Sequence, residues 1–140
     1  MTDEHRKSPR RRDLFQGVAS VLVTVRTPVS RHVDWSKAER VNVLMVEYRF
    51  IPDHLTFRRG VPCCLHLENR GIELHEFTAP AFFAAATLRD PRVLWTGGQE
   101  VVVQPGASAD IEFIPQRSGH YDLTCADHDW AGMTGEIIVR

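Results

Sequence analysis

The chain has few cysteines and no long apolar segment, and these two absences limit what it can be. Three cysteines occur in 140 residues, at positions 63, 64 and 125. An odd number argues against a scaffold held by disulfides and leaves at least one thiol for another role. The nearest approach to a membrane-spanning segment, residues 14–25, is interrupted by polar residues and is shorter than the roughly 20 residues that cross a bilayer. No transmembrane span is predicted.

The chain also lacks the basic surface pattern that binds nucleic acid. Residues 1–40 hold nine Lys/Arg against five Asp/Glu, a net charge of +4, whereas residues 41–140 hold eight against thirteen, a net charge of −5. A hydrophobic fraction of 43% is ordinary for a globular protein, and 140 residues suffice for one domain. We therefore expect a basic leader over residues 1–40, one domain over residues 41–140, and no nucleic-acid partner.

The leader contains paired arginines ahead of a weakly apolar stretch. Arg11-Arg12-Asp13-Leu14-Phe15 followed by such a stretch is typical of a twin-arginine export signal. Arg26 interrupts the stretch early, and no small-x-small cleavage site follows it. Export would place the protein in the periplasm or at the cell surface. The alternative is a disordered basic tail on a cytoplasmic protein.

Short segments of alternating polarity dominate residues 41–140 and predict β-strands. Turn residues such as Asn69-Arg70-Gly71 and Gln104-Pro105-Gly106 separate them. The alternating segments are residues 41–50, 55–57, 63–69, 101–103, 110–113, 121–125 and 137–139. About seven short strands with turns between them are typical of an antiparallel β-sandwich. The exception is the alanine-rich segment 80–88, which begins with proline and predicts one short helix.

The residues with the most distinctive chemistry lie near the C-terminus. Cys125 is followed by His128 and Met133, between a strand that begins Gly-His-Tyr and one that reads Gly-Glu-Ile-Ile-Val. His75 stands upstream, just beyond the predicted strand that ends at Asn69. A thiolate and two imidazoles with a weak axial thioether form the ligand set of blue-copper sites. The pattern therefore predicts one copper site whose ligands are His75, Cys125, His128 and Met133.

With these residues the chain resembles the cupredoxins, the plastocyanin- and pseudoazurin-like blue-copper proteins. The resemblance spans roughly residues 41–140 and includes the pattern Glu47-Tyr48-x-Phe50-x-Pro52 in the first half. It implies an antiparallel Greek-key β-sandwich with one short helix and a single type 1 copper ion. It also implies a one-electron carrier, a monomer and not an enzyme, that exchanges electrons with redox partner proteins and binds no small-molecule substrate.

Two positions bear on how closely the chain follows that family. Plastocyanin-like members have an asparagine after the upstream histidine, which bonds across to the cysteine loop, whereas this chain has Glu76. The effect of Glu76 on the surroundings of the copper and on its potential stays open. Only one cysteine stands at the start of the loop, where the dinuclear copper variant needs two, so we expect a mononuclear site.

The remaining cysteines and histidines give weaker signals. Alternation places Cys63 in the core and Cys64 outward beside His66, and a functional role for this pair is the less favoured interpretation. The other histidines have no partner spacing and are expected on the surface: His5, His32, His54 and His120.

Trp130 and its neighbours form a separate candidate feature next to His128. Asp127, Asp129 and Trp130 either form a docking surface for a partner or belong to a solvated loop with one packed aromatic side chain. The sequence favours neither interpretation over the other.

Other classes of function fit the ligand set less well. The main alternative is a copper-handling protein that delivers copper or confers tolerance without carrying electrons. A metal-free interaction domain is a further alternative. An oxidase or reductase is the weakest, because the chain has no residues for a second copper centre and a substrate pocket.

Overall fold

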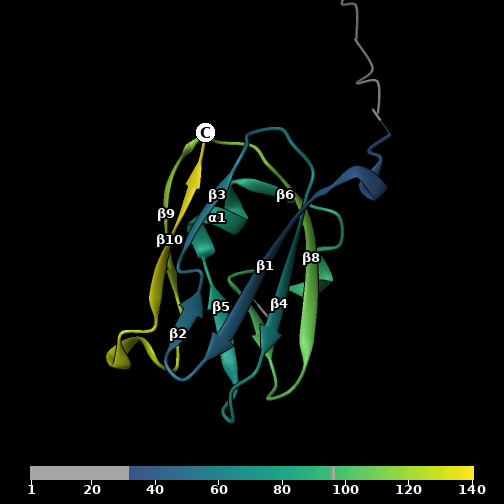
Figure 1. Cartoon of the computed structure of the whole chain (residues 1–140). Coiled ribbons are helices and arrows are strands. Elements are labelled where there is room, and N and C mark those ends of the chain that lie inside the picture. The colour runs from purple at the N-terminus through teal and green to yellow at the C-terminus, as the bar shows by residue number, and fades with distance from the viewer. Residues whose placement is uncertain (1–31, 96) are drawn as a thin grey trace, which may run out of the picture. The chain divides into compact units, whose positions relative to one another are not determined.

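Two five-stranded sheets make up the folded body (Figure 1). The computed structural model describes residues 32–95 and 97–140. One sheet has the strand order β2-β1-β4-β8-β6, and the other has the order β3-β10-β9-β5-β7. The strands are β1 (Glu39–Val46), β2 (Arg49–Ile51), β3 (His54–Phe57), β4 (Cys63–Asn69), β5 (His75–Thr78), β6 (Ala86–Leu88), β7 (Glu100–Val103), β8 (Ser108–Pro115), β9 (Gly119–Thr124) and β10 (Thr134–Val139).

The helical elements are short. One α-helix, α1 (Pro80–Ala84), begins with a proline in its first turn, a position where the missing N–H costs nothing. The described residues also contain three turns of 3-10 helix: η1 (Trp35–Lys37), η2 (Pro91–Val93) and η3 (Asp129–Ala131). Among the residues that the structure describes, no helix is both long enough and apolar enough to span a membrane.

The core lies between the inner faces of the two sheets, as the alternating pattern predicts. Along β4 every second residue is buried, from Cys63 to Asn69. The helix α1 adds Phe82, whose ring lies 5.7 Å from that of Phe57 and 5.2 Å from that of Phe113, measured between centroids. Such clusters contribute most of the apolar burial that stabilises a small sandwich.

The two-sheet sandwich with a short α-helix is confirmed, but two of the strand pairings are parallel. β1 pairs in parallel with β4, and β3 pairs in parallel with β10. These pairings join strands distant in sequence, whereas the periodicity of a single strand contains no information on the direction of its neighbour. A purely antiparallel arrangement is therefore wrong in detail.

Three short strands were not expected from the pattern. The segment predicted as one strand over residues 41–50 is divided by a turn at Glu47-Tyr48 into β1 and β2, which pair with each other. β5 escapes the pattern because three successive residues, His75 to Phe77, are all buried. The segment predicted as a helix over residues 80–88 is helical only to Ala84, since Ala86 to Leu88 pair with β8. That tertiary pairing overrides the helix propensity of alanine.

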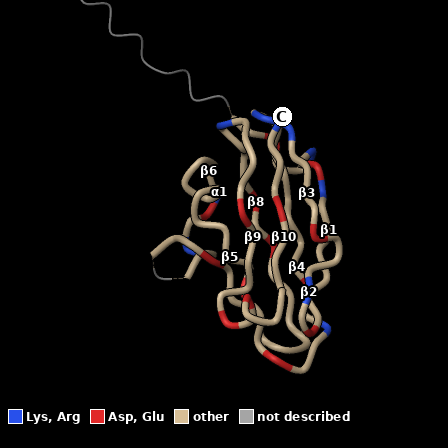
Figure 2. The backbone as a smooth tube through the Cα atoms, turned by 90° about the vertical axis from the view of Figure 1, so that its left-hand side faces the viewer, with Lys and Arg blue, Asp and Glu red and all other residues tan. Residues whose placement is uncertain are grey.

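Charge is unevenly distributed over the folded body. Figure 2 shows Lys and Arg gathered at the end where the C-terminus lies, whereas Asp and Glu are frequent at the opposite end. The loop between β9 and β10 lies at this second end (Figure 1).

Candidate metal centre

The loop that joins β9 to β10 is a compact turn closed by backbone hydrogen bonds. The two strands pair up to Thr124 and Thr134, and directly beyond them the N–H of Cys125 donates to the carbonyl of Met133 at 3.0 Å. Within the loop the N–H of His128 donates to the carbonyl of Cys125 at 3.1 Å. Gly132 closes the loop with a φ of 82°, a left-handed conformation that glycine adopts without strain. The strand pair therefore fixes where Cys125, His128 and Met133 lie.

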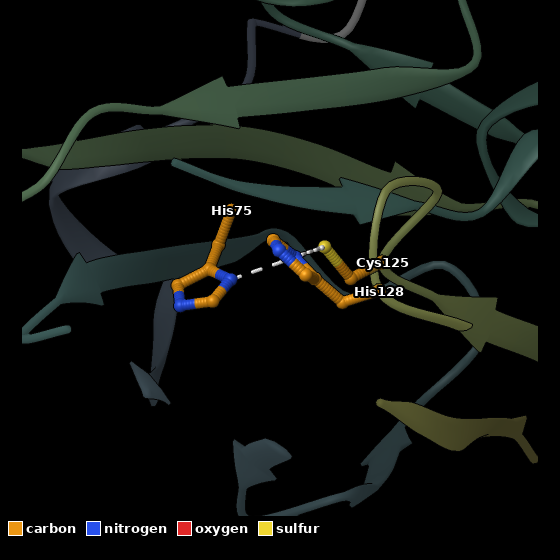
Figure 3. A group of neighbouring side chains, drawn as sticks. All are labelled: His75, Cys125 and His128. Carbon is orange, nitrogen blue, oxygen red and sulfur yellow. Dashed lines mark hydrogen bonds between the residues drawn. The ribbon is translucent and has the colours of Figure 1, made fainter. Parts of the chain in front are cut away.

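Three of the four predicted ligands have their donor atoms close together. His75, Cys125 and His128 each offer one ligand atom, and these atoms lie within 4.8 Å of one another. The Sγ of Cys125 is 3.3 Å from Nδ1 of His128 and 4.0 Å from Nδ1 of His75 (Figure 3). All three residues are buried. Among the residues that the structure describes, this is the single group of three or more His, Cys, Asp or Glu side chains with metal-binding geometry.

The fourth predicted ligand, Met133, is buried at the end of the same loop. Its side chain is inaccessible to solvent. Its backbone N–H and carbonyl bond to His128 and Cys125, at 3.3 and 3.0 Å. Met133 is therefore tied directly to two members of the cluster.

Both imidazoles have a carboxylate at the ring nitrogen that faces away from the thiol. The Nε2 atom of His75 lies 3.2 Å from Oε1 of Glu47, and Nε2 of His128 lies 2.7 Å from Oε2 of Glu73. A neutral imidazole that donates from Nε2 keeps the lone pair of Nδ1 free. A carboxylate can only accept, so both contacts fit a ring that carries its proton on Nε2 and directs the lone pair of Nδ1 toward the region of the thiol, as metal sites require.

Glu76 occupies the position at which the family resemblance implies asparagine, and it makes an equivalent bridge. Its backbone N–H points at the Sγ of Cys125 at 3.4 Å. Its carboxyl Oε2 accepts from the N–H of Asp127, inside the cysteine loop, at 3.0 Å. The residue therefore connects β5 to the loop despite the change in chemistry. Burial raises the pKa of this carboxyl, an effect that the Asp127 N–H partly opposes.

The pKa shifts of the donors follow from the same burial. Removal from water raises the pKa of the Cys125 thiol, although the N–H of Glu76 opposes the shift. Burial also lowers the pKa of His75, and the bond to Glu47 opposes that shift. His75 is therefore neutral and ready to bind a metal at neutral pH, whereas the thiol must lose a proton when a metal binds.

An aromatic group lies beside His128. The Tyr48 ring is 5.0 Å from the His128 ring and 5.8 Å from the ring of Trp130, between centroids. Trp130 is 76% exposed, and its Nε1–H donates to the carbonyl of Asp127 at 2.9 Å. Asp127 and Asp129 are exposed on the same loop. The Tyr48 ring therefore lies beside both Trp130 and His128. This arrangement fits a docking surface and a solvated loop equally.

The other cysteines and histidines lie away from this cluster. Cys63 is buried in the core and Cys64 is half-buried on the outer side of β4, as predicted. His32, His54 and His120 are exposed, also as predicted. The last two are not isolated, because both bond to acidic side chains: His54 to Asp53, and His120 to Glu136. His5 lies outside the described residues.

Sequence reasoning did not identify Glu47, Tyr48 and Glu73 as part of the site. The first two belong to the pattern that carried the family resemblance, so a signal existed without an assigned role. Glu73 has no such signal, because its contact with His128 depends on how the loop before β5 folds.

Comparison with known proteins agrees with the fold. The family model described as a cupredoxin-like domain matches residues 17–139. No curated protein matches the chain. A structure of auracyanin B has 20% identity and a TM-score of 0.57, and the match covers 79% of this chain and 95% of that one. For dithionite-reduced auracyanin from the photosynthetic bacterium Roseiflexus castenholzii, the identity is 16%, the TM-score 0.54 and the coverage 74% and 98%.

Copper enzymes share the same fold. A copper nitrite reductase from Nitrosomonas europaea is 14% identical with a TM-score of 0.54, and the match covers 74% of this chain and 50% of that one. A cluster of two imidazoles, a thiol and a neighbouring thioether fits a single type 1 copper ion, because sulfur favours Cu(I) and imidazole supports Cu(II).

Proposed function

Since the chain belongs to the cupredoxin-like domain family, we propose that it is a one-electron carrier whose copper ion is held by His75, Cys125, His128 and Met133. The observation that carries the proposal is the convergence of one sulfur and two imidazole nitrogens within 4.8 Å in a buried cluster. When bound, copper supplies a Cu(I)/Cu(II) couple.

The protein side of this function is to hold the donors still. Electron transfer is fast when the ligands move little between oxidation states. Here the loop hydrogen bonds fix Cys125 and Met133, and β5 fixes His75. Buried donors also oppose loss of the metal to solvent. A delivery protein, in contrast, needs to release its metal. The geometry therefore favours an electron carrier over a copper-handling protein.

The acidic end of the body favours a particular kind of redox partner. Glu73, Asp127 and Asp129 lie around His128, and Asp and Glu are frequent at this end (Figure 2). A partner protein with positive charge around its own redox centre fits this surface through electrostatic steering. The export signal belongs to this proposal as a hypothesis, because residues 1–31 lie outside the described part of the chain. We accordingly place the protein in the periplasm or at the cell surface.

Voltammetry combined with a copper-transfer assay separates the two candidate roles. A carrier gives a reversible one-electron wave, fast self-exchange between the two oxidation states, and slow loss of Cu(I) to a chelating acceptor. Sluggish redox cycling with rapid transfer of Cu(I) to the acceptor would instead identify a copper-handling protein and contradict the proposal.

A further inference from the structure

Glu73 is placed so that each of its two oxygens has its own partner. Oε2 lies 2.7 Å from Nε2 of His128, and Oε1 accepts from the hydroxyl of Tyr48 at 3.2 Å. The Tyr48 ring also packs beside the His128 ring. A carboxylate held by two groups has fewer orientations to lose than a free surface carboxylate, so its contact with His128 is more persistent than an ordinary exposed ion pair.

The loop that carries Glu73 is itself fixed from both sides. Oε1 of Glu47 accepts the N–H groups of Ile72 and Glu73, at 2.7 and 2.9 Å. Asn69, which is buried, donates from Nδ2 to the carbonyl of Glu73 at 2.8 Å. A Cβ atom at Gly71 would overlap the Glu47 carboxylate, so the loop accepts only glycine there without rearrangement. Hydrogen bonds from the Glu47 and Asn69 side chains to the loop backbone therefore determine where the Glu73 side chain begins.

The two side chains in this contact differ in their exposure to solvent. The side chain of His128 is 11% exposed, whereas that of Glu73 is 43% exposed. Of the two partners in this contact, the carboxylate is therefore the more accessible to water.

We propose that Glu73 is a positioning residue for His128, fixing the Nε2–H tautomer of the ring and favouring Cu(II) over Cu(I) at the site. The first half concerns the protein alone: a carboxylate acceptor at Nε2 leaves the lone pair of Nδ1 toward Cys125. The second half rests on the proposed function, because it needs copper. A negative charge beside a ligand stabilises the more positive oxidation state, so the carboxylate lowers the reduction potential.

Two substitutions separate the hydrogen bond from the charge. In Glu73→Gln the amide oxygen still accepts from Nε2, so the tautomer is retained while the charge is lost. In Glu73→Ala both are lost. Asp127→Asn is the matched control, because Asp127 precedes His128 in the same loop and its carboxylate bonds to neither imidazole among the described contacts.

The first measurement uses the copper-free full-length protein at pH 7. Nitrogen NMR of the His128 ring is expected to show the Nε2–H tautomer in the wild type, in Glu73→Gln and in Asp127→Asn. Glu73→Ala is expected to show a mixture of tautomers. A pure Nε2–H tautomer in Glu73→Ala would overturn the positioning role, whatever the copper chemistry.

The second measurement is the reduction potential of the copper-loaded proteins. Glu73→Gln is expected to favour Cu(I) over Cu(II) about tenfold, measured as the ratio of their dissociation constants. For a one-electron couple this raises the reduction potential by about 59 mV. The shift is no larger because water screens a half-exposed charge. Asp127→Asn is expected to shift the ratio less than twofold. Equal shifts in Glu73→Gln and Asp127→Asn would overturn the specific role of the Glu73 charge. Absence of a reversible wave in the wild type would contradict the proposed function instead, and the NMR result would still decide the positioning role.

Discussion

Replacing Asn69 with alanine is expected to destabilise the protein far more than its single side chain would indicate. Asn69 ends β4, is buried, and makes three side-chain hydrogen bonds. Nδ2 donates to the carbonyls of Glu73 and Val103 at 2.8 and 2.9 Å, and Oδ1 accepts from the N–H of Gly71 at 2.9 Å. The residue thus connects the loop before His75 to both sheets.

The magnitude follows from the three partners that alanine leaves behind. Each buried backbone group that loses its hydrogen bond costs about 1–3 kcal/mol. Water can reach the loop side, where Gly71 and Glu73 lie, so the low end of that range applies to their two groups. The hydrogen bond to the Val103 carbonyl is buried, so the cost of losing it lies in the middle of that range. The sum is a loss of about 3–4 kcal/mol in the free energy of unfolding.

Urea unfolding of the copper-free protein measures this loss. For a slope of about 1.5 kcal/mol per molar urea, the midpoint should fall by about 2 M. Asn42→Ala is the matched control, because Asn42 lies in the neighbouring strand β1 with an exposed side chain that accepts one bond from Arg40. Its effect should stay within about 0.5 kcal/mol. A loss below about 1 kcal/mol for Asn69→Ala, or one equal to that of Asn42→Ala, would refute the assignment of Asn69 as the residue that fixes this loop.

Two further substitutions test the axial ligand and the buried carboxyl. Met133→Leu keeps the volume of a fully buried side chain, so the copper-loaded variant should keep its colour. Its reduction potential should rise, because a weak donor to Cu(II) is lost. An unchanged potential in voltammetry would count against Met133 as the axial ligand. Glu76→Gln keeps the acceptor for the Asp127 N–H and removes a carboxyl whose pKa burial raises. A raised pKa in the folded state means that stability falls as the pH rises through the raised value. From pH 4 to pH 7, the urea midpoint of copper-free Glu76→Gln should therefore rise relative to that of the wild type. A difference between the two midpoints that stays constant with pH would exclude this effect.

The grouping of most of the predicted ligands follows from their local spacing. Cys125, His128 and Met133 lie within nine residues of one another between two strands, so a short loop must hold them together. His75 was included among the predicted ligands because it lies just beyond the strand that alternating polarity predicts over residues 63–69. The structure places the donor atoms of His75, Cys125 and His128 within 4.8 Å of one another.

The surroundings of the cluster were not predictable in the same way. The contact of Glu73 with His128 depends on a loop whose shape is fixed by Glu47 and Asn69, which lie 26 and four residues away in the chain. The parallel pairings of β1 with β4 and of β3 with β10 likewise depend on tertiary packing. Polarity patterns report which face of a strand is buried, but contain no information on its partner.

The central claim is that the Cys125 thiolate and the two imidazoles bind one copper ion together. The most direct test is an absorption and paramagnetic-resonance spectrum of the Cu(II)-loaded protein beside that of its Cys125→Ser variant. An intense visible thiolate-to-copper band with a small copper hyperfine splitting, both lost in Cys125→Ser, is the predicted result. A weak band with the large splitting of tetragonal copper, or a colour that survives in Cys125→Ser, would contradict the claim.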